Sequence, residues 1–188
     1  SETIDVSKIA GITSFKAAAG ITTGNSATVS NLGVNSTVEL AGAAANNGAL
    51  TANLKTDTAA DTMTLKLNKD YTENNDATAT VTALTHTVTT ADIETLTVNS
   101  TGKASTAFLA ATGNKADGVE NTLTLTDDKL VTLIVTGDQA FKFTSAATMT
   151  KLATIDASAN TAGVTIDAKA ALDTSVALTI KGTAKADT

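Results

Sequence analysis

Apolar and polar residues alternate along much of this chain of 188 residues, with the period of two that β-strands show. The clearest runs are residues 61–67, 80–88 and 122–126, in which threonine occupies most of the polar positions. Residues 129–144 add a run of β-forming residues, a Gly-Asp turn and a second alternating run. Because threonine is β-branched and suits a strand with one wet face, these runs predict an all-β fold.

One spacing of apolar residues recurs: two apolar positions three residues apart are followed, two residues later, by a small or apolar one. It occurs at Ile93, Leu96 and Val98, at Leu130, Leu133 and Val135, and at Leu152, Ile155 and Ala157, with a weaker copy at Ile9 and Ile12. The last two full copies are 22 residues apart, and the first two are 37 apart. A second motif, Asp/Asn-Thr-apolar-Thr-Leu, occurs at residues 61–65 and 121–125. These repeats predict a parallel β-helix, or solenoid, because stacked rungs bury their apolar rows as one continuous core.

Two other folds are compatible with parts of this pattern. A β-sandwich also has alternating strands, but its core usually holds a buried Trp or Tyr. This chain has no Trp, and its one Tyr, Tyr71, lies in a polar stretch. A leucine-rich-repeat-like module has a compatible repeat length, but the Asn expected after each rung is missing. The solenoid is therefore the favoured prediction, and the β-sandwich is the alternative.

We expect residues 1–188 to form a single elongated solenoid segment. Polar or Gly- and Ala-rich excursions interrupt it at residues 70–77 and 102–120, and the second fits a loop or a short covering helix. Residues 1–20 are equally compatible with a helical turn and with a strand. Because the sequence starts and stops abruptly, we expect it to be a fragment of a longer chain.

Composition narrows the classes of function. Aromatic residues make up only 3% of the chain, which favours many thin layers of Leu, Ile and Val over one large globular core. All 13 basic residues are Lys and the net charge is −6, so nucleic-acid binding is not expected. No apolar run approaches the roughly 20 residues of a membrane helix, so membrane insertion is not expected either. Without Cys, disulfides and thiolate metal sites are excluded.

The sequence lacks a recognisable catalytic constellation, and we expect that the chain is not an enzyme. His86 is the only His, which leaves almost no side chains for a zinc or nucleophilic site. Glycoside cleavage needs two acids across a cleft, and Asp and Glu are spread over the whole chain. Sugar-cleaving β-helices usually use Asp, Arg or Lys clusters and aromatic platforms, and both Arg and Trp are absent here.

Calcium is the candidate ligand, because it is bound by several oxygens from carboxylates, Asn side chains and backbone carbonyls. The calcium β-roll motif combines closely spaced glycines with an Asp and an apolar residue. Residues 113–119 keep one Gly, Asp117 and the apolar residue, so Asp117 is one candidate. Asp127 and Asp128, together with Asp138, form a second candidate corner. The alternative is that all four are solvated turn residues, since Asp is favoured in turns.

The acidic composition, rich in Thr, Ala and Asn and free of Cys and Arg, together with rungs such as residues 130–138, resembles that of the surface-layer proteins of Gram-negative bacteria and related proteins exported by type I secretion. Residues 182–188 resemble the entry into their C-terminal calcium-binding repeats. The resemblance implies a right-handed parallel β-helix, export without a cleaved N-terminal signal, and calcium-dependent assembly into a two-dimensional lattice. The complete glycine-rich nonapeptides of that family are missing from this chain.

We therefore expect an extracellular structural protein of the bacterial cell surface. Its partners are expected to be further copies of itself, and cell-surface polysaccharide is a second candidate partner. The alternative functions are a secreted adhesin stalk or glycan-binding module, and, third, a β-helical carbohydrate-active enzyme.

Overall fold

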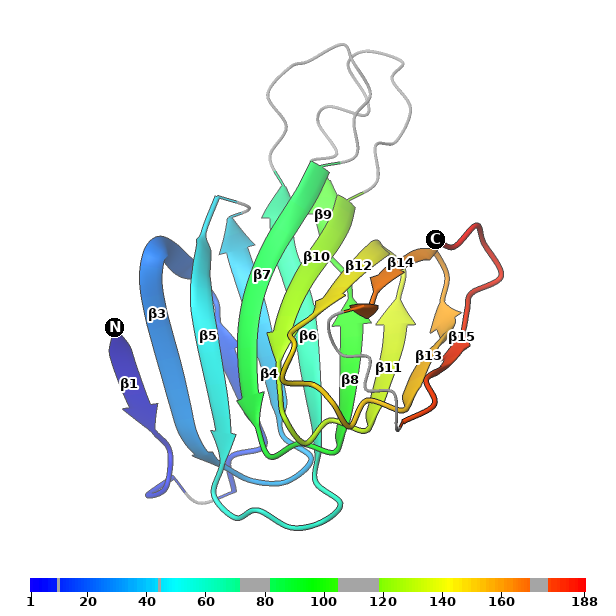
Figure 1. The fold of residues 1–188 in the computed structure, drawn as a ribbon. Helices are drawn as coiled ribbons and strands as arrows, with labels where there is room; N and C mark the ends of the chain where they lie inside the picture. Colours follow the sequence, from blue (N-terminus) through cyan, green and yellow to red (C-terminus); the bar gives the residue numbers. More distant parts are fainter. Residues whose placement is uncertain (10, 44, 72–81, 105–118, 170–175) are drawn as a thin grey trace, which may run out of the picture.

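The computed structural model describes residues 1–9, 11–43, 45–71, 82–104, 119–169 and 176–188 (Figure 1). The strands of sheet A are β1 (Glu2–Asp5), β3 (Ile21–Leu32), β5 (Asn47–Leu54), β7 (Thr82–Ala91), β10 (Val119–Thr126), β12 (Ala140–Ser145) and β14 (Val164–Asp167). The strands of sheet B are β2 (Ser14–Ala17), β4 (Thr37–Ala43), β6 (Thr62–Tyr71), β8 (Thr95–Ser100), β9 (Lys103–Ala104), β11 (Thr132–Gly137), β13 (Thr154–Asn160) and β15 (Thr179–Lys181).

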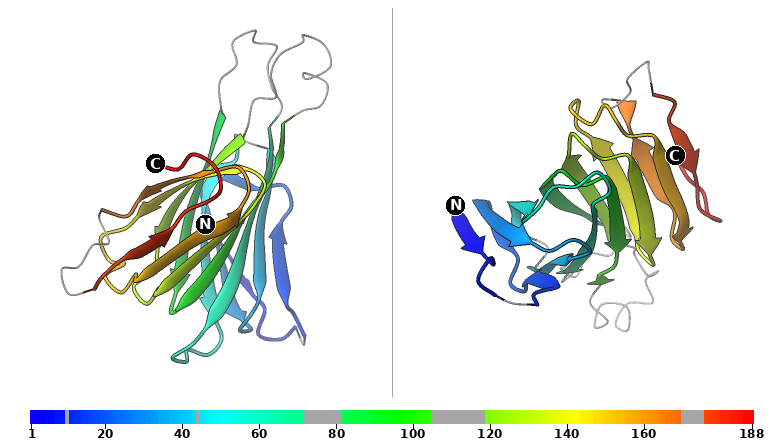
Figure 2. Two further views of the ribbon diagram at one scale, coloured as in Figure 1. Left: turned by 90° about the vertical axis from the view of Figure 1, so that its right-hand side faces the viewer. Right: turned by 90° about the horizontal axis from the view of Figure 1, so that it is seen from below.

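The chain passes alternately through the two sheets, so that one strand of each sheet makes a rung. Sheet A has the order β1-β3-β5-β7-β10-β12-β14, and sheet B has the order β2-β4-β6-β8-β11-β13-β15, with β9 beside β6. Every strand pairing in the described residues is parallel, and the two termini lie at opposite ends of the stack (Figure 2). The prediction of a parallel solenoid is therefore confirmed, and the β-sandwich is excluded.

The repeated apolar spacing is the register of sheet B. Leu133 lies beside Leu96 on one side and beside Ile155 on the other, and Val135 lies beside Val98. A slip by one residue would turn this whole apolar row to solvent, which fixes the register. The longer spacing between the first two full copies reflects an insertion that contains residues 105–118, outside the described residues.

Other sequence expectations have different outcomes. The weaker copy at Ile9 and Ile12 is not a rung, because β2 begins only at Ser14 and Phe15 pairs with Val38. Ile9 is 55% exposed. Residues 1–20 contain two strands, which agrees with the strand alternative and not with the helical turn. Most of the predicted excursions 70–77 and 102–120 lies outside the described residues.

The core is a continuous apolar strip between the two sheets. It runs from Val6 in the first rung to Ala168 in the last, and its largest fully buried side chains are Phe141 and Phe143 of β12. Outward-facing positions carry threonine. In sheet B a column of stacked threonines comprises Thr62, Thr95, Thr132, Thr154 and Thr179. In sheet A the equivalent column comprises Thr3, Thr28, Thr51, Thr89 and Thr126.

Asparagine side chains tie the turns of neighbouring rungs together. Asn46 Nδ2 donates to the Ala19 carbonyl at 2.7 Å, and Asn160 Nδ2 donates to the Gln139 carbonyl at 3.0 Å. Asn31 and Asn35 have φ angles of 66° and 61°, in the left-handed region that Asn tolerates.

Candidate functional site: the acidic edge

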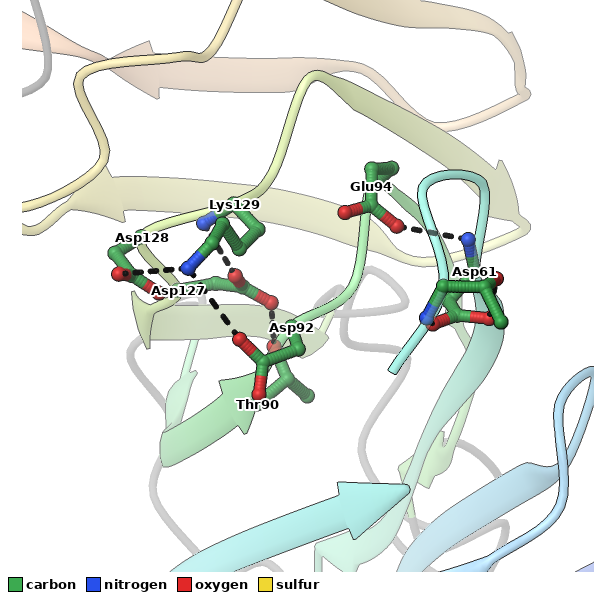
Figure 3. Close-up of polar contacts among 8 residues, drawn as sticks. Asp61, Thr90, Asp92, Glu94, Asp127, Asp128 and Lys129 are labelled. Carbon is green, nitrogen blue, oxygen red and sulfur yellow. Dashed lines mark hydrogen bonds and ion pairs between the residues drawn. The ribbon is translucent and has the colours of Figure 1, made fainter. Parts of the chain in front are cut away.

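Carboxylates gather where the strands of sheet A end and those of sheet B begin, which is the lower edge in Figure 1. Three consecutive rungs contribute, through residues 55–61, 92–94 and 127–131. The acidic side chains are Asp61, Asp92, Glu94, Asp127 and Asp128 (Figure 3). We call these five residues the acidic edge. Stacking of parallel rungs brings them together although they are distant in sequence.

Asp127 is buried, at 1% exposure, and its carboxylate is occupied by the protein's own donors. Its Oδ2 accepts a hydrogen bond from Thr90 Oγ1 at 2.6 Å, and its Oδ1 accepts one from the Lys129 backbone N–H at 2.9 Å. Burial raises the pKa of the Asp127 carboxyl to about 6, although the hydrogen bonds from Thr90, Lys129 and Ile93 act against this. Asp127 therefore holds the turn between β10 and β11.

Asp92 and Asp128 flank a lysine ammonium. Lys129 Nζ lies 3.5 Å from Asp92 Oδ1 and 3.4 Å from Asp128 Oδ2. The Asp128 side chain is 62% exposed and the Asp92 side chain 39% exposed. Hydrogen bonds and charge attraction from these two carboxylates raise the pKa of Lys129, with Asp128 the larger cause. These exposed pairs orient the corner but contribute little to folding.

Glu94 and Asp61 join two further turns. Glu94 Oε2 accepts a hydrogen bond from the Asp61 backbone N–H at 2.7 Å. The Asp61 carboxylate accepts hydrogen bonds from the Thr58 backbone N–H at 2.6 Å and from Thr58 Oγ1 at 2.7 Å. Both carboxylate oxygens of the buried Asp61 thus accept hydrogen bonds within its own loop. Of these two acidic side chains, Glu94 is the one that contacts the neighbouring rung.

The predicted calcium ligands do not come together in one place. Asp127 and Asp128 lie on the acidic edge, but Asp138 follows β11 at the opposite edge, where its backbone N–H donates to the Ser100 carbonyl at 3.1 Å. Asp117 lies outside the described residues. Among the described residues, no group of three or more His, Cys, Asp or Glu side chains is arranged to hold a metal ion. Within one copy, the carboxylates of Asp127 and Asp61 accept hydrogen bonds from the protein's own donors, and Lys129 lies between those of Asp92 and Asp128.

Sequence reasoning missed Asp92 and Glu94, although the repeat contained the signal. Ile93 and Leu130 are equivalent positions of the apolar spacing, and their rungs are neighbours in sheet B. The residues on either side of Ile93 therefore lie beside Lys129 and Val131. Aligning the rungs before searching for charged clusters would have found both acids.

A second polar group lies inside the solenoid near its upper edge. Buried His86 lies with Nε2 3.0 Å from Asn121 Oδ1, while Asn121 Nδ2 donates to Ser100 Oγ at 2.9 Å and to the Thr101 carbonyl at 2.8 Å. Because the Asn121 oxygen can only accept, Nε2 carries a hydrogen. Burial, with the Lys69 charge as a second cause, lowers the pKa of His86 to about 3. The other ring nitrogen of His86, Nδ1, is buried without a hydrogen-bond partner among the described residues.

Protonation of His86 makes the fold acid-sensitive. Its pKa is 6.5 when unfolded and about 3 when folded, so its contribution is fully present above pH 6.5 and is lost as the pH falls toward 3. Each pH unit of acidification in this window lowers the contribution of His86 to the free energy of unfolding by about 1.4 kcal/mol. Asp127 acts oppositely between about pH 4 and 6, because its pKa is raised. The measurement is therefore the difference between wild type and His86→Gln in urea unfolding at pH 4 to 7. The wild type should lose more stability on acidification, and parallel curves would contradict this assignment.

Comparisons with known proteins give no match. No protein-family description, no curated protein and no solved structure matches the chain. In the part of the chain that the structure describes, no helix is long and apolar enough to cross a membrane.

Proposed function

We propose that the chain is a structural segment of a bacterial surface layer, which associates with further copies of itself on the cell exterior into a two-dimensional lattice. The observation that carries the proposal is the repetitive parallel solenoid. The Thr-rich, Arg-free rungs that resemble those of surface-layer proteins supply the biological setting.

The end rungs support self-association. Within the described residues, β1 and β2 have a neighbouring strand on one side only, and a cavity of about 440 Å³ lies at this end, lined by Ile4, Phe15 and Ile21 among others. At the other end, Ile180 of β15 is 51% exposed. Unpaired strand edges and exposed apolar side chains are features through which β-proteins associate.

Calcium is the proposed link between copies at the acidic edge. Asp92 and Asp128 have the more exposed carboxylates of this edge, and Lys129 holds them in place. Calcium takes six to eight oxygen ligands, more than this pair supplies. Acidic side chains of a second copy would complete the set and displace the Lys129 ammonium. Binding of this kind would occur only with association.

The test is multi-angle light scattering with negative-stain imaging, first in excess chelator and then in millimolar calcium. We expect a small species in chelator and growth into sheets or large regular particles in calcium. The double variant Asp92→Asn/Asp128→Asn should lose this growth, whereas Asp138→Asn, on the opposite edge, should retain it. A sharp monomer in both conditions would contradict self-assembly, and glycan binding by an adhesin or spacer would then be tested next. Equal growth of both variants would contradict the acidic edge as the link.

A further inference from the structure

Lys69 is a buried lysine that has no carboxylate partner among the described residues. It lies on β6 at 2% exposure, beside Gly42 of β4. Lys69 Nζ donates to the Thr85 carbonyl at 2.8 Å and to Asn47 Oδ1 at 3.1 Å. The ion pairs among the described residues do not include Lys69.

A buried ammonium without a counter-charge is costly, and the lysine responds by favouring its neutral form. Burial lowers the pKa of Lys69 to about 8. Roughly a tenth of the side chains therefore carry a free amine at neutral pH. A neutral amine is a nucleophile, whereas an ammonium is not.

The group in contact with this amine is a carboxamide, which is an electrophile. Asn47 begins β5 in sheet A, so its contact with Lys69 crosses from one sheet to the other. The amide carbon Cγ is one carbonyl bond, about 1.2 Å, from the oxygen that Nζ already contacts. Holding two reacting groups side by side removes much of the entropy cost of a bimolecular encounter, and effective concentrations reach about 10⁵–10⁸ M once the reacting atoms are aligned.

We propose that Lys69 and Asn47 form an intramolecular isopeptide bond that joins the two sheets. Lys69 Nζ attacks Asn47 Cγ, the new C–N bond forms, and the bond between Cγ and Nδ2 breaks. The proton lost by Nζ leaves on Nδ2, so that the by-product is one ammonia molecule. No oxidant, reductant or cofactor takes part. In a chain without Cys, this bond would supply the covalent link that a disulfide supplies elsewhere.

The first test is the intact mass of the purified, folded protein after incubation at neutral pH. We expect a mass lower than that of the sequence by one ammonia. Protease digestion should yield one branched peptide, in which the segment containing Asn47 is joined to the segment containing Lys69. A full sequence mass after days of incubation would overturn the proposal, and the wild-type protein alone decides this outcome.

Variants separate the cross-link from a competing reaction. Gly48 follows Asn47, and attack of its backbone nitrogen on the same Cγ would also release ammonia, giving a succinimide. Lys69→Met and Asn47→Ala should both keep the full mass. Lys66→Met is the matched control, because Lys66 lies on the same strand but pairs outward with Glu39 at 3.8 Å, and it should still lose ammonia. Ammonia loss that persists in Lys69→Met, without a branched peptide in the wild type, would assign the loss to the succinimide and overturn the proposal.

Discussion

Gly137→Ala is expected to lower the free energy of unfolding by roughly 3–5 kcal/mol. Gly137 ends β11 with a φ of 105°, a conformation that residues with a Cβ rarely adopt. An added Cβ would lie 2.1 Å from the Ser100 carbonyl oxygen, which belongs to the neighbouring strand β8. That oxygen accepts hydrogen bonds from the backbone N–H groups of Asp138 and Gln139, each at 3.1 Å. Relieving the clash would break contacts that join two rungs.

Gly24→Ala is the matched control. Gly24 also has a positive φ, 84°, but no atom lies within 4 Å of the position that its Cβ would take. Only the backbone cost of about 1–2 kcal/mol applies there. Urea unfolding of the two variants, followed by circular dichroism, measures the difference. Equal destabilisation would mean that the close approach between neighbouring rungs contributes nothing beyond the backbone conformation.

The rungs of sheet B could be predicted from the sequence because burial requires an apolar residue at each inward-facing position. Leu96, Leu133 and Ile155 have to face inward together, and the residues between them have to face water. The repeat length was harder to recognise in the sequence than the fold, because the segments between strands differ in length while the strands stay aligned.

The first rung could not be predicted in the same way. Ile9 and Ile12 have the spacing of a rung, but Phe15 occupies the position beside Val38. The difference is physical, because no described strand lies on the outer side of this rung. Phe15 is only partly buried against the core and Ile9 is 55% exposed, so the burial that selects the apolar positions of the other rungs is weaker here. Spacing alone was then an insufficient guide.

Only Asp127 and Asp128 of the candidate site were predicted, because proximity in sequence is a poor guide in a solenoid. Asp128 and Asp138 are close in sequence, but β11 runs between them from one edge of the molecule to the other. Asp92 and Asp128 are far apart in sequence, yet both lie within 3.5 Å of the same ammonium. The relevant neighbours are the residues at equivalent positions of adjacent rungs. These are visible only once the register is known.

Phe143→Ala is expected to cost about 4 kcal/mol of folding free energy. Phe143 is fully buried on β12, with Leu123 and Ile166 as its neighbours in sheet A. The cavity left by the ring cannot collapse readily, because the backbones on both sides are fixed by parallel hydrogen-bond ladders. Phe15→Ala is the control, since Phe15 is only partly buried in the first rung, and we expect about 1–2 kcal/mol there.

The two substitutions should also differ in which strands lose stability. In a solenoid each rung contacts only its neighbours, so destabilisation is local before it is global. Hydrogen exchange of Phe143→Ala should therefore show weakened amide protection in β10, β12 and β14, with β3 and β5 little changed. Phe15→Ala should weaken protection in β2 and β4 instead. Uniform loss of protection throughout the chain in either variant would mean that the rungs unfold as one cooperative unit, and the nearest-neighbour description would then not apply to this protein.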